Sequence, residues 1–346
     1  MNITKKLISW YSDNKRDLPW RNTTNPYFIW LSEIILQQTQ VVQGLPYYMS
    51  FTSNFPTVFD LAKAEETEVL KLWQGLGYYS RARNLHASAK YIVNDLNGEF
   101  PNTFNTIIKL KGVGDYTASA IASICFDEST AVVDGNVYRA LSRIYGIDTP
   151  INTGKGFKAF KALSQELIDK KQPATYNQAI MEFGARQCKP KNPDCTVCPF
   201  NKKCVAFQNN EIEVLPVKLK TLKVKKKYFN FIVMLSNDGK TYLEQRKGKG
   251  IWQNLYQFPL IETDKPSKII EIEHGLKRLD LLKDQEYEVS IYNEKEIIHK
   301  LSHQHLYTKF WIVTLSDNLP SGISTKEIRD FPVPILIGNF IESFNF

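Results

Sequence analysis

The sequence predicts a multidomain protein in which an all-α N-terminal domain is followed by a smaller α+β domain. First, 346 residues exceed the usual size of a single domain. Second, apolar residues recur at helical spacing as far as about Phe207, whereas they alternate along the chain after Lys227. Third, a lysine-rich stretch separates the two patterns. We therefore expect a helical domain over residues 1–208, a linker over 209–227 and an α+β domain over 228–346.

Composition and charge restrict the class of protein. The hydrophobic fraction is 43% and the charged fraction 23%, as in ordinary globular proteins, and no apolar run is long enough to cross a bilayer. The N-terminus lacks the pattern of a secretory signal, so we expect a cytoplasmic protein without membrane association. We also expect a monomer. A formal net charge of +8 is compatible with a polyanionic partner such as DNA, although many basic proteins bind no nucleic acid.

Helical periodicity in the N-terminal domain is clear in segments such as Val58, Leu61 and Ala62, with Asn, Gly or Pro between successive helices. The segment Pro216 to Lys227 then contains six lysines, no acidic residue and no helical apolar stripe. This composition indicates a solvated linker, and a segment lying along DNA is the alternative.

Beyond the linker, alternation predicts a β-strand from Phe229 to Leu235. Residues 237–239, Asn-Asp-Gly, favour a tight hairpin because they adopt positive φ angles readily. The remaining segments complete the α+β domain. We expect strands at Tyr287–Tyr292 and Leu306–Leu315, and helices at about Ser267–Leu279 and Val333–Phe344.

Four of the five cysteines form one tight group, while Cys125 stands alone in an apolar helical stretch. The spacing is C-x6-C-x2-C-x5-C, which suits four thiolates around one metal centre. Zinc more often uses two short C-x2-4-C pairs, so the spacing favours an iron–sulfur cluster while leaving zinc open. The group consists of Cys188, Cys195, Cys198 and Cys204.

A glycine turn and a later aspartate are the remaining local signals. Gly112 and Gly114 separate two helical stretches and allow a sharp turn whose N–H groups can hold a phosphate, but a simple turn or helix end explains such glycines more often. Asp134 follows an apolar run and precedes a glycine, which on its own predicts a helix N-cap. Asp115 is a second N-cap candidate.

Together these features resemble the superfamily of DNA glycosylases that carry a helix-hairpin-helix, a Gly/Pro-rich loop and an aspartate. Its iron–sulfur branch matches the spacing of all four cysteines, and the resemblance implies a 4Fe–4S cluster. The sequence is most similar to the adenine-removing family, and the similarity extends through nearly the whole chain. The motifs that carry it are LPWR at 18–21, WLSEIILQQT at 30–39, GLGYYSR at 75–81 and DGNV at 134–137.

Cleavage of the bond between adenine and deoxyribose requires protonation of the leaving group and stabilisation of a sugar cation. The resemblance implies that Glu33 protonates adenine N7 and then assists water, while Asp134 stabilises the cation, with Tyr116 and Asn136 orienting the two acids. Glu33 has apolar helical neighbours such as Trp30, so we expect a raised pKa. Helical glutamates in general lie at the surface, which is the alternative.

Position 116 separates the adenine glycosylases from bifunctional relatives that cut pyrimidine lesions. Those relatives carry a lysine there to form a Schiff base, and Tyr116 cannot. The sequence therefore predicts hydrolysis without strong lyase activity. Two rival hypotheses are a bifunctional pyrimidine-lesion glycosylase and a non-catalytic iron–sulfur protein that binds DNA.

The target base must leave the duplex to reach such a pocket. By resemblance, the partner is double-stranded DNA with adenine opposite 8-oxoguanine or guanine. Tyr78 would be the wedge, although core packing is the ordinary role of a tyrosine. The hairpin of Gly112 and Gly114 would hold a phosphate. The other implied DNA contacts are Leu76 and Gly77 beside the wedge, Gln38 and Thr39 in the vacated space, and Arg21 and Gln178 in the adenine pocket.

One position in the adenine pocket departs from the pattern of some relatives, which have glutamate where this chain has Gln178. Both side chains form hydrogen bonds with a base edge. The departure leaves the identity of the adenine contacts open.

The C-terminal domain resembles a Nudix-like domain that reads 8-oxoguanine. Residues 227–346 contain no glutamate-rich Nudix catalytic box, so we expect recognition rather than catalysis. Ser302 and His303 align with a Phe-Ser-His loop of the family, although Leu301 replaces the phenylalanine. The alternative is that Ser302 and His303 are a polar pair within a strand that has His305 on one face.

Overall fold

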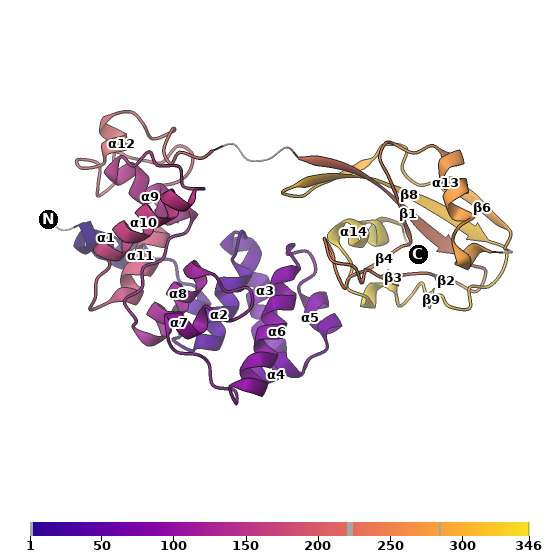
Figure 1. The fold of residues 1–346 in the computed structure, drawn as a ribbon, viewed down its shortest axis with the longest axis horizontal. Helices are drawn as coiled ribbons and strands as arrows, with labels where there is room; N and C mark the ends of the chain where they lie inside the picture. The colour runs from indigo at the N-terminus through magenta and orange to yellow at the C-terminus, as the bar shows by residue number, and fades with distance from the viewer. Residues whose placement is uncertain (1–2, 220–223, 284, 345) are drawn as a thin grey trace. The chain divides into compact units, whose positions relative to one another are not determined.

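The computed structural model of the chain describes residues 3–219, 224–283, 285–344 and 346 (Figure 1). It divides into two compact units. The helical unit comprises Met1–Lys63 and Asn84–Lys220, and the mixed unit comprises Ala64–Arg83 and Thr221–Phe346. The predicted order of an all-α part followed by an α+β part is confirmed. The segment Ala64–Arg83, which the sequence places in the helical domain, groups by its contacts with the C-terminal residues.

Short polar and proline signals set the helix boundaries of the helical unit. Asn25 accepts a hydrogen bond from the Tyr27 N–H, and Pro26 occupies the first turn, so α2 begins there. The elements are α1 (Ile3–Asn14), η1 (Pro19–Arg21), α2 (Pro26–Ile35), α3 (Val41–Asn54), α4 (Val58–Lys63), α7 (Phe104–Ile107), α8 (Asp115–Phe126), α9 (Gly135–Tyr145), α10 (Gly154–Leu167), α11 (Pro173–Arg186) and α12 (Val205–Gln208).

The centre of the helical unit is formed around α8. This helix packs against α2 and α11, and α11 in turn packs against α1 and α9. Small residues allow the close approach: Ala118, Ala120 and Ala122 are fully buried on α8. The arrangement brings the start of α8, the start of α9 and one face of α2 close to α11, although these helices are distant in sequence.

The mixed unit contains α5 (Glu66–Leu72) and, through Arg83, the first turn of α6 (Ser80–Asp95), followed by a five-stranded sheet. The strand order is β5-β1-β8-β6, and β7 pairs with β8. The two long central strands are parallel, and Lys225 is opposite Gln304 at the start of their ladder. The sheet strands are β1 (Lys225–Leu235), β5 (Leu260–Thr263), β6 (Tyr287–Ile291), β7 (Ile297–Lys300) and β8 (Gln304–Leu315).

Side chains on both faces of this sheet are buried. On one face Trp311 packs in a cluster with Ile272 and Leu276 of α13 (Ile269–Leu276). On the other face Phe310 stacks on Phe340 of α14 (Ile335–Phe344), with ring centroids 4.0 Å apart. The remaining elements are β2 (Lys240–Thr241), β3 (Glu244–Gln245), β4 (Tyr256–Gln257), η2 (Asp280–Leu282), β9 (Ile323–Ser324) and η3 (Ile328–Asp330).

Two expectations for this region need correction. The turn after β1 forms, with Gly239 at φ +70° and the Ser236 N–H donating to the Lys240 carbonyl oxygen at 3.1 Å, but the ladder pairing of the strand that follows is with β9. The predicted solvated linker is partly structured, because Leu215 is only 5% exposed and packs with Cys204. The strand β1 also begins within the predicted linker, at Lys225. Residues 220–223 of that linker lie outside the described residues.

Candidate active site

One pocket of about 1080 Å³ lies in the helical unit where α2, α8, α9 and α11 meet. This volume is sufficient for a nucleobase and its sugar. Most of the residues that the sequence predicts for catalysis and base recognition line it together. These are Arg21, Glu33, Gln38, Thr39, Gly114, Tyr116, Asp134, Asn136 and Gln178.

Glu33 lies on α2 with its side chain directed into this pocket, and it is only 8% exposed. Burial raises the pKa of the Glu33 carboxyl to about 7. A hydrogen bond with Tyr116 lowers that pKa in part, the negative charge of Asp134 raises it, and Arg21 lowers it. The expected raised pKa is therefore confirmed, and near neutral pH this carboxyl is able to hold a proton and to release it.

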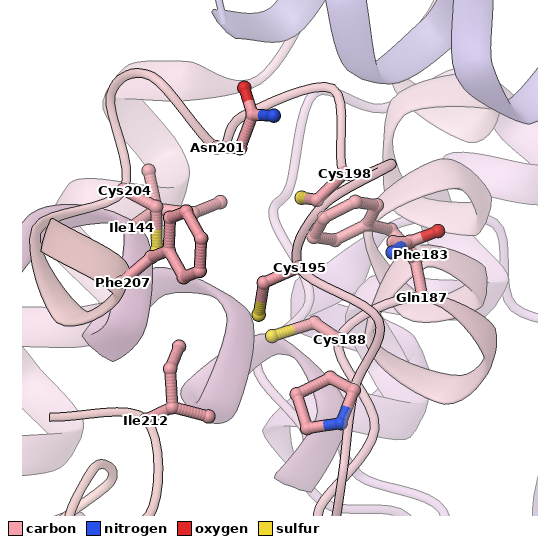
Figure 2. Close-up of a pocket in the computed structure, with 11 residues that line it drawn as sticks. Ile144, Phe183, Gln187, Cys188, Cys195, Cys198, Asn201, Cys204, Phe207 and Ile212 are labelled. Atoms are coloured by element: carbon pink, nitrogen blue, oxygen red, sulfur yellow. The ribbon is translucent and has the colours of Figure 1, made fainter. Parts of the chain in front are cut away.

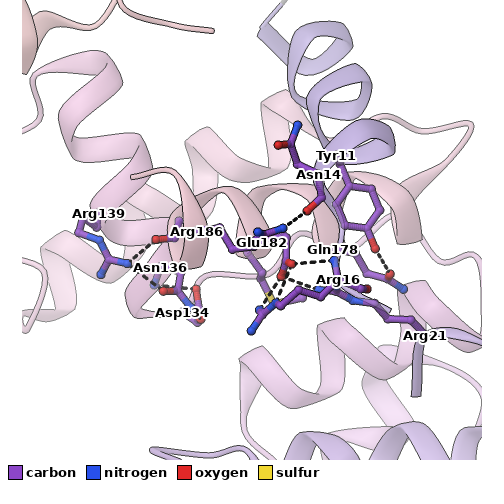
Figure 3. A network of polar contacts seen from close by, with 12 residues as sticks. Tyr11, Asn14, Arg16, Arg21, Asp134, Asn136, Arg139, Gln178, Glu182 and Arg186 are labelled. Carbon is purple, nitrogen blue, oxygen red and sulfur yellow. Dashed lines mark hydrogen bonds and ion pairs between the residues drawn. The ribbon is translucent and has the colours of Figure 1, made fainter. Parts of the chain in front are cut away.

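Asp134 is the N-cap of α9, as its position predicts. Its Oδ1 accepts hydrogen bonds from the backbone N–H groups of Asn136 and Val137 at 2.9 and 2.8 Å. The Asn136 amide donates to Oδ2 at 2.8 Å, and Arg139 donates to the Asn136 Oδ1 at 2.9 Å (Figure 3). Burial raises the pKa of Asp134, while these hydrogen bonds lower it. The Asp134 carboxylate thus caps α9, and its hydrogen bonds fix it in position at the wall of the pocket.

Tyr116 lies in the first turn of α8, and its hydroxyl lies 3.1 Å from the Met181 sulfur and within hydrogen-bonding reach of the Glu33 carboxyl. Burial, with Glu33 and Asp134 nearby, raises its pKa, so the hydroxyl keeps its proton. The neighbouring Asp115 is not the N-cap that was expected. Gly114 occupies that position, and Asp115 instead forms an ion pair with Lys161 at 2.6 Å.

The glycine turn before α8 is tight for a steric reason. Gly112 has φ +79°, and a Cβ there would lie 2.9 Å from the Asn84 side chain. The Gln37 side chain approaches the same turn and donates to Thr117 at 3.2 Å. Only glycine can occupy position 112 without strain, and both Gly112 and Gly114 are exposed.

A buried ion-pair network that the sequence did not predict forms one wall of the pocket. Glu182 on α11 has a side chain that is 1% exposed, and Arg16 and Arg21 donate to it at 2.6 and 2.7 Å (Figure 3). Burial alone would raise its pKa, but the two guanidinium groups lower the pKa of Glu182 to about 2. No short motif marks these residues, because Glu182 lies more than 160 positions from both arginines.

The segment between α2 and α3 carries Gln38 and Thr39 at the pocket edge. Gln38 has φ +56°, a conformation that is costly for a residue with a side chain. Residues with such strained backbone angles occur frequently at active sites and ligand-binding positions.

In the mixed unit, Tyr78 has the same unusual backbone, with φ +47°, and is 48% exposed. Its hydroxyl forms a hydrogen bond with the Ser302 hydroxyl. Ser302 and His303 are exposed in the turn between β7 and β8, so they do not form the alternative polar strand. Gly77 has φ +75°, whereas the Leu76 side chain is buried.

All four clustered cysteines line a second pocket in the helical unit, with apolar neighbours that include Phe183 and Phe207 (Figure 2). Within the described residues, no three His, Cys, Asp or Glu side chains are placed to hold one metal ion directly. Thiolates bound to one zinc ion at about 2.3 Å would have sulfurs within about 4 Å of each other. An all-thiol donor set around one cavity fits the ligand chemistry of an iron–sulfur cluster as well as that of zinc.

Arg143 on α9, a residue without a sequence signal, holds this loop. It is 2% exposed, donates to the backbone oxygen of Lys189 at 2.7 Å, and approaches the Cys188 sulfur at 3.6 Å. The Phe200 N–H approaches the Cys198 sulfur at 3.5 Å. Donors of this kind stabilise thiolate ligands.

In the described part of the chain, no helix is both long and apolar enough to cross a membrane.

Comparisons with known proteins place both units in described families. Residues 31–167 match the HhH-GPD superfamily of base excision DNA repair proteins, and residues 230–343 match the NUDIX domain. The chain is 36% identical over 317 residues to an adenine DNA glycosylase of Buchnera aphidicola subsp. Baizongia pistaciae, which covers 89% of this chain and 85% of that protein. A second Buchnera adenine DNA glycosylase, from subsp. Schizaphis graminum, is 32% identical, and the match covers 99% of this chain and 98% of that protein. The human adenine DNA glycosylase is 44% identical over 218 residues, which are 60% of this chain and 40% of that protein.

Solved structures agree on the fold of the helical unit. A thermostable thymine-DNA glycosylase has a TM-score of 0.56 and 29% identity, and covers 60% of this chain and 95% of its own. A trapped endonuclease III–DNA covalent intermediate has a TM-score of 0.53 and 20% identity over 60% of this chain and 94% of its own, which supports the fold alone.

Proposed function

Because this chain belongs to the adenine DNA glycosylase family, we propose that it removes adenine from duplexes in which adenine lies opposite 8-oxoguanine or guanine. It is a DNA N-glycosylase of base excision repair, a hydrolase that acts on an N-glycosidic bond. The observation that carries the proposed chemistry is one pocket lined by both Glu33 and Asp134. Its cytoplasmic location and monomeric state stay predictions.

Glu33 would act as the general acid. Adenine leaves only when a ring nitrogen takes up a proton, and a carboxyl with a pKa of about 7 donates one near neutral pH. Protonation of adenine N7 by Glu33 would leave a carboxylate. That carboxylate would then accept a proton from the water that attacks the sugar.

Asp134 would stabilise the positive charge that develops on the sugar. Its carboxylate is held by two backbone N–H groups and by the Asn136 amide, so it needs no reorganisation when the charge forms. We assign Asn136 to the orientation of Asp134. The Tyr116 hydroxyl would orient Glu33.

Tyr116 also favours hydrolysis over lyase chemistry. A Schiff base with the sugar requires an amine, and a phenol that keeps its proton provides none. The Lys161 ammonium, which is not part of the pocket lining, is engaged with Asp115 and Ser119. We therefore propose an enzyme that leaves the DNA strand intact after it releases the base.

Extrusion of adenine would depend on residues that fill or wedge the duplex. Tyr78 is exposed on a strained turn, as a side chain that enters a base stack requires. Gln38, on a similarly strained backbone, would fill the vacated space together with Thr39. The N–H groups of the Gly112–Gly114 hairpin would contact a phosphate.

The contact between Tyr78 and Ser302 supports a role for Ser302 in reading the base opposite adenine. A serine hydroxyl beside the proposed wedge is able to donate to, or accept from, an oxidised guanine. His303 adjoins it in the same exposed turn. This assignment gives the mixed unit a recognition role.

Cys188, Cys195, Cys198 and Cys204 would hold a 4Fe–4S cluster, consistent with their shared pocket. When bound, such a cluster would link the ends of the loop by covalent Fe–S bonds and fix its shape. The loop carries Lys189, Lys191, Lys202 and Lys203, whose charges suit a DNA backbone. The cluster would thus have a structural role in DNA binding.

The test compares labelled duplexes with adenine opposite 8-oxoguanine, guanine or thymine under single-turnover conditions. We expect excision opposite 8-oxoguanine and guanine and much slower excision opposite thymine. Ser302→Ala should lower the preference for 8-oxoguanine over guanine by about fivefold, as expected for one lost hydrogen bond. Ser321→Ala, an exposed serine in the same unit, is the control and should not change it. Equal rates on all three duplexes would contradict the proposal.

A further inference from the structure

The Gln178 amide is held from one side by a tyrosine of α1. The Tyr11 hydroxyl donates to the Gln178 Oε1 at 2.6 Å (Figure 3). Tyr11 is buried and does not line the pocket, whereas Gln178 does. Burial raises the pKa of Tyr11, so its hydroxyl keeps the proton that it donates. This hydrogen bond orients the amide oxygen of Gln178 toward Tyr11.

The other end of the amide is available to a ligand. Among the residues that the structure describes, the Gln178 Nε2 group has no hydrogen-bond partner, although the side chain lies at the wall of the pocket. A carboxamide with its oxygen fixed on one side presents its N–H groups on the other. Gln178 thus offers a donor to the pocket and not an acceptor.

The same tyrosine also holds Arg21. The Arg21 guanidinium lies over the Tyr11 ring, 5.5 Å from its centroid, and donates to Glu182 one helical turn beyond Gln178. Tyr11 and Glu182 together restrain two pocket-lining side chains on neighbouring parts of the wall. The ring restrains Arg21, and the hydroxyl restrains Gln178.

We propose that Tyr11 is a positioning residue that sets base specificity, because its hydroxyl makes Gln178 donate to a ring nitrogen of the extruded adenine. This inference rests on the proposed function and refines it. A glutamate at position 178 would present an acceptor and would instead pair with the 6-amino group. Without the Tyr11 hydroxyl, the Gln178 amide would be free to rotate and to use either end.

The experiment measures binding to duplexes in which adenine, 1-deazaadenine, 3-deazaadenine or 7-deazaadenine lies opposite 8-oxoguanine. Each deaza analogue removes one ring-nitrogen acceptor and leaves the 6-amino group in place. The Glu33→Gln holoenzyme is the background, so that no base is released during the titration. Into it we introduce Tyr11→Phe, which keeps the ring under Arg21 and removes only the hydroxyl.

We expect one of the three analogues to bind about fivefold more weakly than adenine in the background protein, which is the usual effect of one neutral hydrogen bond. Tyr11→Phe should reduce that loss to less than twofold and leave the affinity for adenine nearly unchanged. Tyr27→Phe removes another buried tyrosine hydroxyl, which donates to the Phe55 carbonyl away from the pocket, and should keep the loss in full.

The inference would be overturned if each analogue lost the same affinity relative to adenine in the Tyr11→Phe protein as in the Tyr27→Phe protein. A uniform loss of affinity for all four duplexes in Tyr11→Phe alone would also overturn it, because that result indicates a structural role only. Wild-type protein that releases no adenine from any duplex would instead remove the proposed function. Adenine release with losses independent of Tyr11 would remove only this inference.

Discussion

Replacement of Glu33 by glutamine should stabilise the folded protein at alkaline pH. The pKa of Glu33 is raised from its usual 4.5 to about 7. Between these values the unfolded carboxyl is ionised while the folded one keeps its proton. The favourable contribution of protonated Glu33 is complete below pH 4.5 and is lost as the pH rises through 7.

The size of the effect follows from the shift. The difference between 4.5 and 7, at 1.36 kcal/mol per pKa unit, corresponds to a cost of about 3 kcal/mol for ionised Glu33 above pH 8. Glutamine has a similar shape and no charge, so Glu33→Gln avoids this cost. The free energy of unfolding of Glu33→Gln should exceed that of the wild type by about 3 kcal/mol at pH 8.5 and by close to zero at pH 4.5.

Urea unfolding of the holoenzyme, followed by tryptophan fluorescence at several pH values, measures this difference. At about 2–4 °C per kcal/mol, thermal unfolding at pH 8.5 should show a rise of about 6–12 °C in Tm. Glu213→Gln, at an exposed glutamate of the same unit, is the control and should show no such trend. A stability difference that does not change with pH would refute the raised pKa of Glu33.

Three further changes test other parts of the site. Glu182→Gln should lower the free energy of unfolding by up to about 3 kcal/mol at neutral pH, because the pKa of Glu182 is lowered to about 2. This loss should shrink as the pH falls from 4.5 towards 2, and urea unfolding at pH 7 and pH 3 measures it. Gly184→Ala should lower the excision rate at least tenfold in a single-turnover assay, because the added Cβ would lie 2.6 Å from the Asn136 carbonyl oxygen and displace the start of α9. Gly154→Ala, which adds a Cβ in open space, is the control in the same assay. Cys198→Ser should abolish the visible absorption and the bound iron of the purified protein, whereas a colourless wild type that contains zinc would contradict the assignment of a cluster.

Glu33 illustrates how much of the site is predictable from the sequence. Its apolar neighbours on α2 predict a raised pKa, but helical periodicity alone does not separate a buried glutamate from an exposed one. The family motif makes that distinction. For Asp134 the local prediction of an N-cap is correct and does not exclude the proposed catalytic role, because one oxygen caps the helix and the other faces Asn136.

Other features depend on contacts between distant residues, which no local pattern encodes. The ion pairs of Glu182 join α11 to the segment after α1. The contact of Tyr78 with Ser302 spans more than 200 positions. Alternation predicts the strands around Phe231 and Phe310, but not that they lie in parallel, because strand partners depend on the whole sheet. Asp115 likewise lies inside α8, with Gly114 as the N-cap, and pairs with Lys161, which is 46 positions away.

The most direct test of the catalytic pair is a single-turnover assay on a labelled duplex with adenine opposite 8-oxoguanine, with and without alkali. Wild-type holoenzyme should give strand cleavage only after alkali, and Glu33→Gln and Asp134→Asn should each abolish the product. Asparagine caps helices as well as aspartate does, so the second variant should stay folded. Full activity in either variant, or cleavage by the wild type without alkali, would contradict hydrolysis by Glu33 and Asp134.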